Sequence, residues 1–572
     1  MEIGMRLLTL FFLIFLLFGC GDKTVKKITV PEKITDTQKI NDSGETTNTI
    51  NSENPIDNTV IEETPINQKP IDDKQAADTQ ESDDNKQISD TEERPTSFVT
   101  GEFLPSKKFA NICRNPRQNN KYQDLLGTYK DENNWIRSWS HETYLWYSEL
   151  PDIDPANIVD PIDYFDRMKT NAKTSSGIPK DRFHFAMNTA ESELLSETGI
   201  SVGYGARAKQ DTKTGKVYVT YTEPNSPARY ANIRRGTEIV AAGGIYLDSI
   251  VTDEQLDIFN SALFPQTLRE PHSFILKKPN SIFPESIILT SSAITEIPVH
   301  LTKTFKANGS NIGYLMLNSF HIETTEIQLI NAINQLKSAQ ISELILDLRY
   351  NGGGYLGISA VLGTMIVGDT AYGQVFENSI FNDKHSQYHP IFNELIEPFL
   401  FPETTLGYST IAGTPLPKLN LSRVFIISTN DTASASEALI NSLRGIDVEV
   451  ILIGETTYGK PYGFYGTDNC GTTYFTIQFK GTNAKGFGDY ADGFIPSAAD
   501  NGKDRVKGCL VSDDLSNPLG NTNEKMLGTA IHYIANDNCP TETMPLRNNH
   551  SLLSTVSGEV IRRHPTEVIM LR

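Results

Sequence analysis

The chain has 572 residues and a formal net charge of −20 at pH 7, with 71 acidic against 51 basic side chains. This acidic balance argues against a nucleic-acid partner, because binding to phosphates needs a basic face. No C-x-x-C pair and no histidine cluster in the sequence indicates zinc, so we expect neither a metal nor an organic cofactor.

The first twenty residues read as a targeting segment. Arg6 lies in a short basic start, and residues 7–18 are almost wholly apolar but too short to span a bilayer comfortably. The run ends at Leu17-Phe18-Gly19-Cys20, which resembles a bacterial lipobox. The resemblance implies that residues 1–19 are a signal peptide and that Cys20 carries a lipid which tethers the chain to the cell envelope. Gly21 favours the outer membrane, with the periplasmic or surface side left open; an uncleaved anchor or an ordinary secretion signal is the alternative.

Residues 20–100 are predicted to form a disordered acidic linker. Positions 21–97 contain no aromatic residue and no leucine, and positions 22–97 hold 18 acidic against 9 basic residues. Such a composition cannot bury a core. Such a linker has an end-to-end distance of about 5–6 Å multiplied by the square root of the number of its residues.

Four further cysteines follow the linker. They form an even set that permits two disulfides in three connectivities, which suits an extracytoplasmic compartment, although free buried thiols remain the alternative. The four are Cys113, Cys470, Cys509 and Cys539.

Residues 101–195 are predicted to be a helical N-terminal domain. Trp135, Trp139 and Trp146 would share one face of a helix over residues 132–148, as expected of a core stripe. A second helical pattern covers residues 160–170.

Residues 196–297 alternate short apolar strands with turns. Ser226-Pro227-Ala228 and the later Gly236-Thr237-Glu238-Ile239 resemble the Ser-Pro-Ala helix and the Gly-Asp-Ile-Ile turn of PDZ domains. PDZ domains add a peptide strand to a sheet edge. Residues 198–205 match the carboxylate-binding loop only loosely, so the resemblance leaves open whether this region binds peptide or gates the site.

From residue 298 onward, strands alternate with helices. Residues 312–317 and 343–347 read as strands on either side of a helix over residues 325–336, and residues 424–427 form another apolar run that leads into a helix. This alternation predicts an α/β sheet with its active site at strand ends. A further helical pattern covers residues 523–535.

A serine and a lysine lie at two of these predicted strand ends. Ser434 falls on a strand-to-helix turn, where backbone N–H groups are unpaired. A hydroxyl there becomes a nucleophile beside a base, and Lys460 can serve if burial lowers its pKa. The pair predicts acyl-transfer chemistry. Ser436 is the second candidate for the nucleophile.

Three motifs in order resemble the C-terminal processing peptidases, also called tail-specific proteases. The resemblance spans residues 196–540 and implies a serine peptidase core with a ClpP/crotonase-like α/β fold over residues 298–540, an embedded PDZ domain and a tail over residues 541–572. It assigns Ser434 as nucleophile, Lys460 as general base, and the N–H groups of Ala435 and of a glycine in the triplet, Gly353 or Gly354, as the oxyanion hole. The motifs are Asp347-Leu348-Arg349-Tyr350-Asn351-Gly352-Gly353-Gly354, Thr432-Ala433-Ser434-Ala435-Ser436-Glu437 and Gly454-Glu455-Thr456-Thr457-Tyr458-Gly459-Lys460.

The chain departs from the family pattern at one position. Many members carry a glutamine four residues after the lysine, which orients the amine, and Phe464 stands there in this chain. Either Gln478, on a predicted strand over residues 474–479, takes over this role, or the dyad works unassisted. The competing interpretation makes Gln478 a solvent-facing strand residue.

The sequence therefore predicts a lipid-tethered serine endopeptidase that cleaves extracytoplasmic proteins or peptides. The alternative is a catalytically weak or silent peptide-binding lipoprotein on a peptidase scaffold. Neither reading identifies the substrate, the oligomeric state, or an activator or adaptor.

Overall fold

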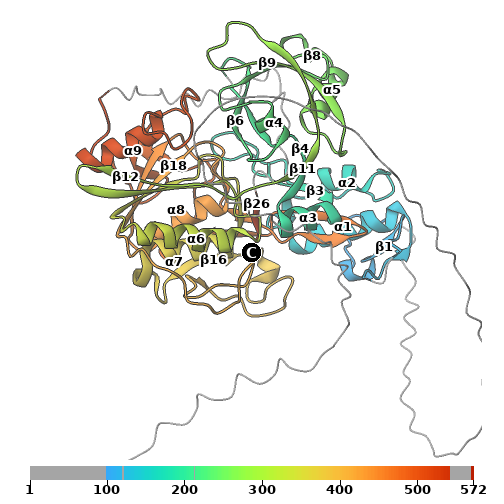
Figure 1. The fold of residues 1–572 in the computed structure, drawn as a ribbon. Helices are drawn as coiled ribbons and strands as arrows, with labels where there is room; N and C mark the ends of the chain where they lie inside the picture. Colours follow the sequence, from blue (N-terminus) through green and yellow to red (C-terminus); the bar gives the residue numbers. More distant parts are fainter. Residues whose placement is uncertain (1–97, 119–120, 212, 542–568, 572) are drawn as a thin grey trace, which may run out of the picture. The chain divides into compact units, whose positions relative to one another are not determined.

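A computed structural model describes residues 98–118, 121–211, 213–541 and 569–571 (Figure 1). The predicted signal peptide, Cys20, nearly all of the predicted linker and most of the predicted tail lie outside these residues. No helix in the described part of the chain is long and apolar enough to cross a membrane.

A seven-stranded sheet forms the centre of residues 298–541, which make up the α/β region. Its order is β12-β13-β14-β18-β19-β25-β24, with β12 antiparallel to β13 and every other neighbouring pair parallel. This arrangement confirms the predicted α/β fold. The strands are β12 (Val299–Ala307), β13 (Ser310–Leu317), β14 (Glu343–Asp347), β18 (Arg423–Ser428), β19 (Glu449–Gly454), β24 (Ile495–Ser497) and β25 (Arg505–Leu510).

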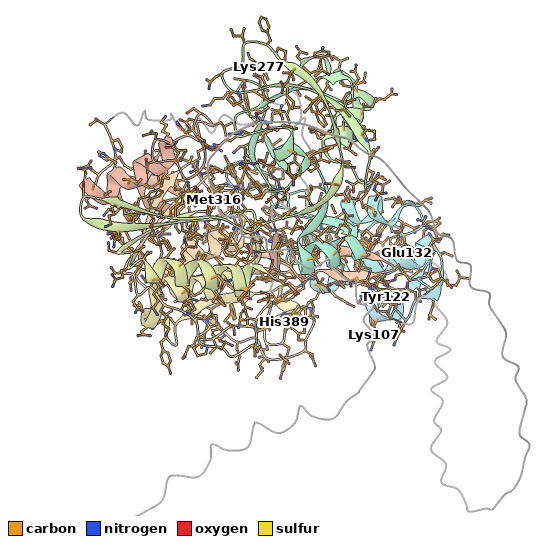
Figure 2. All side chains as sticks on the ribbon, in the orientation of Figure 1. Lys107, Tyr122, Glu132, Lys277, Met316 and His389 are labelled. Carbon is orange, nitrogen blue, oxygen red and sulfur yellow. A yellow bond between two sulfur atoms is a disulfide. The ribbon has the colours of Figure 1, made fainter. Side chains whose placement is uncertain are left out.

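Helices cover both faces of this sheet, which explains why its central strands β14, β18 and β19 are largely apolar and buried. Alternate residues of β18 point to opposite sides: Val424 and Ile426 pack with α6, α7 and α8, whereas Phe425 and Ile427 pack with α9. Met316 of β13 is fully buried on the α9 side (Figure 2). The helices are α6 (Thr325–Ser338), α7 (Leu356–Val367), α8 (Ala435–Gly445) and α9 (Lys525–Asn536).

The N-terminal region, residues 98–198, is joined to the α/β region by a sheet, a hydrophobic core and a disulfide. β3 pairs with β22 of the three-stranded sheet β21-β22-β3, and Trp135 and Trp139 pack against Tyr474 of β22. Cys113 is bonded to Cys470. The elements are β1 (Ile112–Cys113), β2 (Leu125–Leu126), α1 (Tyr129–Thr143), α2 (Pro161–Arg167), β3 (Phe185–Asn188), α3 (Thr189–Thr198), β21 (Thr467–Asn469) and β22 (Thr472–Phe475).

The predicted helix over residues 132–148 is shorter than expected. The helix α1 ends at Thr143, so Trp146 does not share the face of Trp135 and Trp139, and its ring instead meets Tyr462 at 4.9 Å. The cause is a tertiary bond: the Leu145 N–H donates to the carbonyl of Ile477, at 2.8 Å, which draws the chain out of the helix.

Residues 200–295 form a β-rich region with its own core. Its main sheet runs β10-β9-β7-β6-β5, with β8 paired to β7, while β4 pairs with β11. Phe259 of α5 and Val217 of β6 are fully buried in this core. The elements are β4 (Ile200–Gly203), β5 (Ala206–Gln210), β6 (Val217–Thr222), α4 (Pro227–Tyr230), β7 (Glu238–Ala242), β8 (Ile245–Tyr246), α5 (Asp253–Leu263), β9 (Pro271–Lys277), β10 (Glu285–Thr290) and β11 (Ser292–Thr295).

Short strands complete the α/β region. A four-stranded sheet runs β17-β16-β23-β20, and β15 pairs with β26. The predicted single strand over residues 474–479 is wrong: β22 ends at Phe475 and β23 begins at Phe479, with an irregular segment between them. The second disulfide joins Cys509 to Cys539. The strands are β15 (Gly353–Tyr355), β16 (Val375–Ile380), β17 (Phe399–Leu400), β20 (Tyr462–Gly463), β23 (Phe479–Thr482) and β26 (Ile569–Leu571).

Candidate active site

The candidate nucleophile lies on the turn between β18 and α8. Ser434 immediately precedes α8, and its backbone has φ 60° and ψ −115°. Residues other than glycine rarely adopt this conformation. Its hydroxyl oxygen is buried and has no hydrogen-bond partner in the described part of the chain. Ala435 opens the helix, where first-turn N–H groups have no intrahelical acceptor. A strained turn therefore holds the Ser434 hydroxyl next to the Ala435 N–H at the start of α8.

Asn351 joins this turn to the glycine triplet. Its carbonyl accepts from the Ala433 N–H at 3.1 Å and from the Ser436 hydroxyl at 3.0 Å. Its side-chain Oδ1 accepts from the Gly353 N–H at 2.9 Å. The Ser436 hydroxyl is thus engaged in a structural bond, and the Gly353 N–H is engaged within its own turn.

Gly354 is the glycine of the triplet whose backbone faces away from Asn351. On one side, β15 bonds to Phe320, whose N–H donates to the Gly353 carbonyl at 2.8 Å and whose carbonyl accepts from Tyr355 at 2.9 Å. Backbone groups alternate in direction along a strand, so the Gly354 N–H and carbonyl point to the opposite side. A Cβ at Gly354 would lie 2.1 Å from the backbone nitrogen of His321, which explains why only glycine fits.

Lys460 is fully buried next to two aromatic rings. Its Nζ lies 4.1 Å from the ring centre of Phe464 and 5.3 Å from that of Phe183. Burial lowers the pKa of Lys460 to about 7, while Asp181 and Glu437 oppose the shift by favouring the charged form. With this pKa, about half of the molecules have a neutral Lys460 at pH 7, and a neutral amine can accept a proton.

Glu437 holds the serine turn and the lysine loop together. Its Oε2 accepts from the N–H groups of Ser434 at 2.9 Å and Lys460 at 2.8 Å. Its Oε1 accepts from the Gly459 N–H at 2.7 Å and the Thr457 hydroxyl at 2.6 Å. The sequence predicted no role for Glu437 by itself, although a Glu three positions after an N-cap serine is the signal of a capping box.

The N-terminal region completes the surroundings of the lysine. Arg182 donates from Nη2 to the carbonyl of Tyr458 at 2.7 Å, and Phe183 contributes one of the two aromatic rings next to the amine. Asp181 is buried, accepts from the Tyr144 hydroxyl at 2.7 Å and acts on Lys460 through its charge. These residues lie far from the motifs in sequence, and no local pattern marked them.

Gln478 is fully buried, so its interpretation as a solvent-facing residue is wrong. Its Oε1 accepts from the Tyr465 N–H at 2.9 Å, and its Nε2 is buried without a hydrogen-bond partner among the described residues. Its predicted role in orienting Lys460 stays a prediction. Phe464, four residues after Lys460, has the nearer of the two aromatic rings to the amine.

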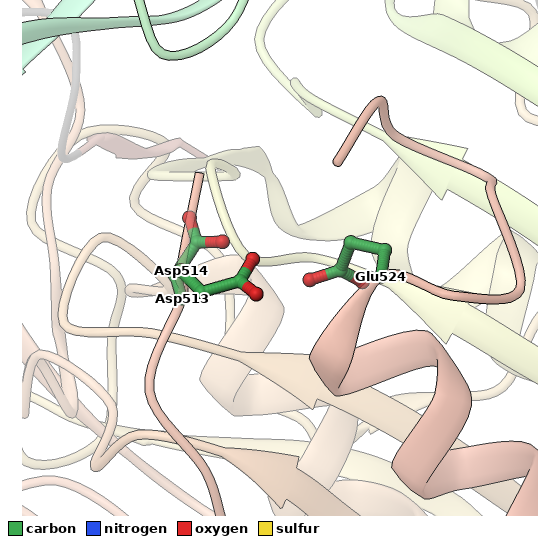
Figure 3. Close-up of side chains that lie close together, drawn as sticks. All are labelled: Asp513, Asp514 and Glu524. Atoms are coloured by element: carbon green, nitrogen blue, oxygen red, sulfur yellow. The ribbon is translucent and has the colours of Figure 1, made fainter. Parts of the chain in front are cut away.

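One carboxylate cluster in the described part of the chain is compact enough to hold a metal ion. Oxygen atoms of Asp513, Asp514 and Glu524 all lie within 4.8 Å of one another (Figure 3). However, Glu524 binds both terminal nitrogens of buried Arg349 at 2.9 Å, and Asp513 pairs with Arg349 and Arg235. The cluster therefore serves as a buried ion-pair network that supports the turn after β14, and nothing else assigns it to a metal.

Comparison with known proteins agrees with this geometry. Residues 311–463 match the model of peptidase family S41, and residues 131–184 match that of the peptidase S41 N-terminal domain. The first match contains the glycine triplet, Ser434 and Lys460; the second contains Asp181 and Phe183. Two segments of the chain are thus similar to peptidase family S41.

Curated relatives are carboxyl-terminal processing proteases. One from Picosynechococcus is 26% identical over 267 residues, covering 46% of this chain and 56% of the relative. CtpB of Bacillus subtilis is 23% identical over 283 residues, covering 49% of this chain and 51% of the relative. The chain thus spans about half the length of the curated relatives it matches. A crystal structure of an S41 protease from Bacteroides fragilis shares the fold, with a TM-score of 0.52 and 23% identity over 74% of this chain and all of that one.

Proposed function

We propose that the protein is a serine endopeptidase in which Ser434 is the nucleophile and Lys460 the general base. The observation that carries the proposal is the state of these two groups. Ser434 offers an unpartnered hydroxyl on a strained turn, Lys460 has its pKa lowered to about 7, and one carboxylate fixes the backbone of both.

In the proposed reaction, neutral Lys460 takes the proton of the Ser434 hydroxyl as its oxygen attacks the scissile carbonyl. Lys460 then returns this proton to the departing amine, which leaves an acyl group on Ser434. Lys460 then takes a proton from water, whose oxygen attacks the acyl carbon. As the acyl–oxygen bond breaks, Lys460 returns the proton to Ser434 and the acid product leaves. Asp181 and Glu437 favour the protonated lysine that each half-reaction forms, because both act on it as nearby negative charges.

The oxyanion of each tetrahedral intermediate needs donors in place before the charge develops. We assign the Ala435 N–H and, from the triplet, the Gly354 N–H, because the Gly353 N–H already donates to Asn351. The Ala435 N–H lies at the start of α8, and the Gly354 N–H lies on β15.

Cleavage of a disordered test protein is the direct test. We expect the purified protein to cut it, and the Ser434→Ala variant to fold normally and leave it intact. Mass spectrometry of the products would locate the cut sites. Retained cleavage by Ser434→Ala would overturn the assignment of the nucleophile.

Peptide binding without turnover is the second candidate function. It is favoured by the β-rich region of residues 196–297, which we interpret as PDZ-like, and by the ion pair at 2.9 Å between Lys209 of β5 and Asp431 on the serine turn. This pair links the region directly to the site. This function would be selected if the unsubstituted protein binds peptides without ever cleaving them and Ser434→Ala binds the same peptides with equal affinity.

We also propose that Cys20 carries a lipid that tethers the protein to the envelope, with the outer membrane as the favoured location. The support is the sequence Leu17-Phe18-Gly19-Cys20. Full-length protein made in a bacterial host should partition into the detergent phase, and Cys20→Ser should partition into the aqueous phase. Equal partitioning of the two proteins would contradict the proposal.

A further inference from the structure

Neither Ser434 nor Lys460 has any exposed surface in this structure. A substrate carbonyl must contact the serine hydroxyl, so something occupies or covers the place that a substrate would take. The surrounding elements are β15 with the glycines, α8 with Ala435 at its start, and β20 just after Lys460.

The strand β26 lies against all three of these elements. It pairs with β15 and contacts both α8 and β20. It comes from the far end of the sequence, whereas its neighbours all belong to the segment that matches the peptidase family model.

The pairing is parallel and places Gly353, Gly354 and Tyr355 opposite Ile569, Met570 and Leu571 respectively. Because Phe320 takes the other side of β15, the N–H and carbonyl of Gly354 face β26. In a parallel ladder these two groups bond to the residues on either side of the partner, so Gly354 donates to the Ile569 carbonyl and accepts from the Leu571 N–H. The N–H that we assigned to the oxyanion hole therefore holds a peptide carbonyl of the chain itself.

We propose that the groove beside β15 is a binding site for extended peptides, entered by strand addition, and that residues 569–571 are its resident ligand. The segment competes with substrate for the Gly354 N–H and carbonyl. Recognition through backbone groups tolerates many side chains, so the groove takes extended peptides as a class. The competition for substrate rests on the proposed function; the binding of peptide to the groove does not.

Mass action gives the expected size of the effect. The apparent affinity for an added peptide falls by the fraction of molecules in which the groove is empty, so a segment bound nine-tenths of the time weakens an added peptide about tenfold. Because the segment belongs to the same chain, its occupancy does not depend on protein concentration.

The test uses the full-length protein with Ser434→Ala, so that binding is measured without cleavage. The probe is a fluorescently labelled peptide with the sequence of residues 565–572, followed by anisotropy. Adding Leu571→Pro removes the N–H that bonds to Gly354, and Met570→Pro introduces the same ring where the N–H points away from β15. We expect Leu571→Pro to bind the probe about tenfold more tightly than Met570→Pro.

A second pair of probes places the modification on the added peptide. N-methylation at the position of Leu571 should abolish binding to the Leu571→Pro protein, and N-methylation at that of Met570 should leave it unchanged. Equal affinities of the two protein variants, or equal binding of the two methylated probes, would overturn the proposal.

Cleavage assays separate this inference from the proposed function. In the protein with its serine intact, Leu571→Pro should raise kcat/KM, and the unlabelled peptide should inhibit competitively. If cleavage depends on Ser434 but is affected neither by Leu571→Pro nor by the unlabelled peptide, residues 569–571 are not a resident ligand, and the proposed peptidase activity is retained. If the two proline variants differ in probe affinity but the protein cleaves nothing, the peptidase proposal is rejected and the peptide-binding groove is retained.

Discussion

Substituting Lys460→Met is expected to lower kcat by about a thousandfold while substrate binding is retained. Methionine has a similar length and no charge, so it fits next to Phe183 and Phe464 without leaving a cavity. What is lost is the group that removes the proton from Ser434. The measurement is steady-state cleavage of a peptide substrate, with Lys507→Met as control, because Lys507 is a partly exposed lysine paired with Glu449. Activity of Lys460→Met within tenfold of the parent would mean that another base serves the serine.

The same lysine predicts two pH dependences of known sign. The base must be neutral, so kcat/KM of the parent should rise with pH through a midpoint near 7 and then level off, since burial lowers the pKa of Lys460 to about 7. The folded pKa lies below the ordinary value of 10.5, so the unfolded chain binds more protons between these two values. The destabilisation caused by this lysine is thus complete below pH 7 and disappears above 10.5. Lys460→Met should accordingly raise Tm more at about pH 6 than at about pH 10.

Substituting Glu437→Gln is expected to lower both kcat and stability. The amide nitrogen of glutamine cannot accept, so two of the four donors that now face the carboxylate lose their partner. Each buried donor left unpaired costs about 1–3 kcal/mol, and either choice of amide orientation frees the Lys460 loop or the Ser434 turn. We expect kcat to fall about a hundredfold at a temperature where the variant is fully folded, because small displacements of reacting groups have effects of this order.

Glu326→Gln is the matched control for this substitution. Glu326 is also fully buried and also accepts from three backbone N–H groups and one hydroxyl, those of Leu406, Gly407, Ser409 and Thr410. Its loss should reduce Tm to a similar extent but leave kcat nearly unchanged. Equal losses of kcat in the two variants would show that Glu437 contributes stability alone.

The parts of the fold that the sequence predicted are those set by local periodicity and by motifs. The strand β18 and the helix α6 lie where apolar spacing placed them, and the S41 family matches agree with the resemblance drawn from the glycine, serine and lysine motifs. Helix ends were less predictable. The helix α1 ends at Thr143, because the Leu145 N–H bonds to the distant Ile477 carbonyl, and no local sequence pattern indicates that bond. Burial was misjudged at Gln478 for the same reason, because the residues that cover it lie elsewhere in the chain.

The surroundings of the lysine depend on contacts between distant segments. Phe183 lies well before Lys460 in the chain, and β26 lies well after it, yet both contact elements of the site. Nothing in the amphipathic pattern of either segment indicates its partner. A motif can therefore predict the reacting groups, but the medium that tunes the base and the strand that lies beside the glycines required the structure.

The bond between Cys113 and Cys470 has a consequence for the order in which the protein can mature. Its two cysteines are separated by 357 positions, and the partners of β3 and of the α1 tryptophans are synthesised equally late. The N-terminal region therefore cannot complete its core as it leaves the ribosome, ahead of the rest. The disulfide can form only after the chain has been made as far as Cys470, beyond both Ser434 and Lys460. The contact of Phe183 with Lys460 also joins distant segments, so the surroundings that lower the pKa of Lys460 form only after the N-terminal region has packed against the later part of the chain.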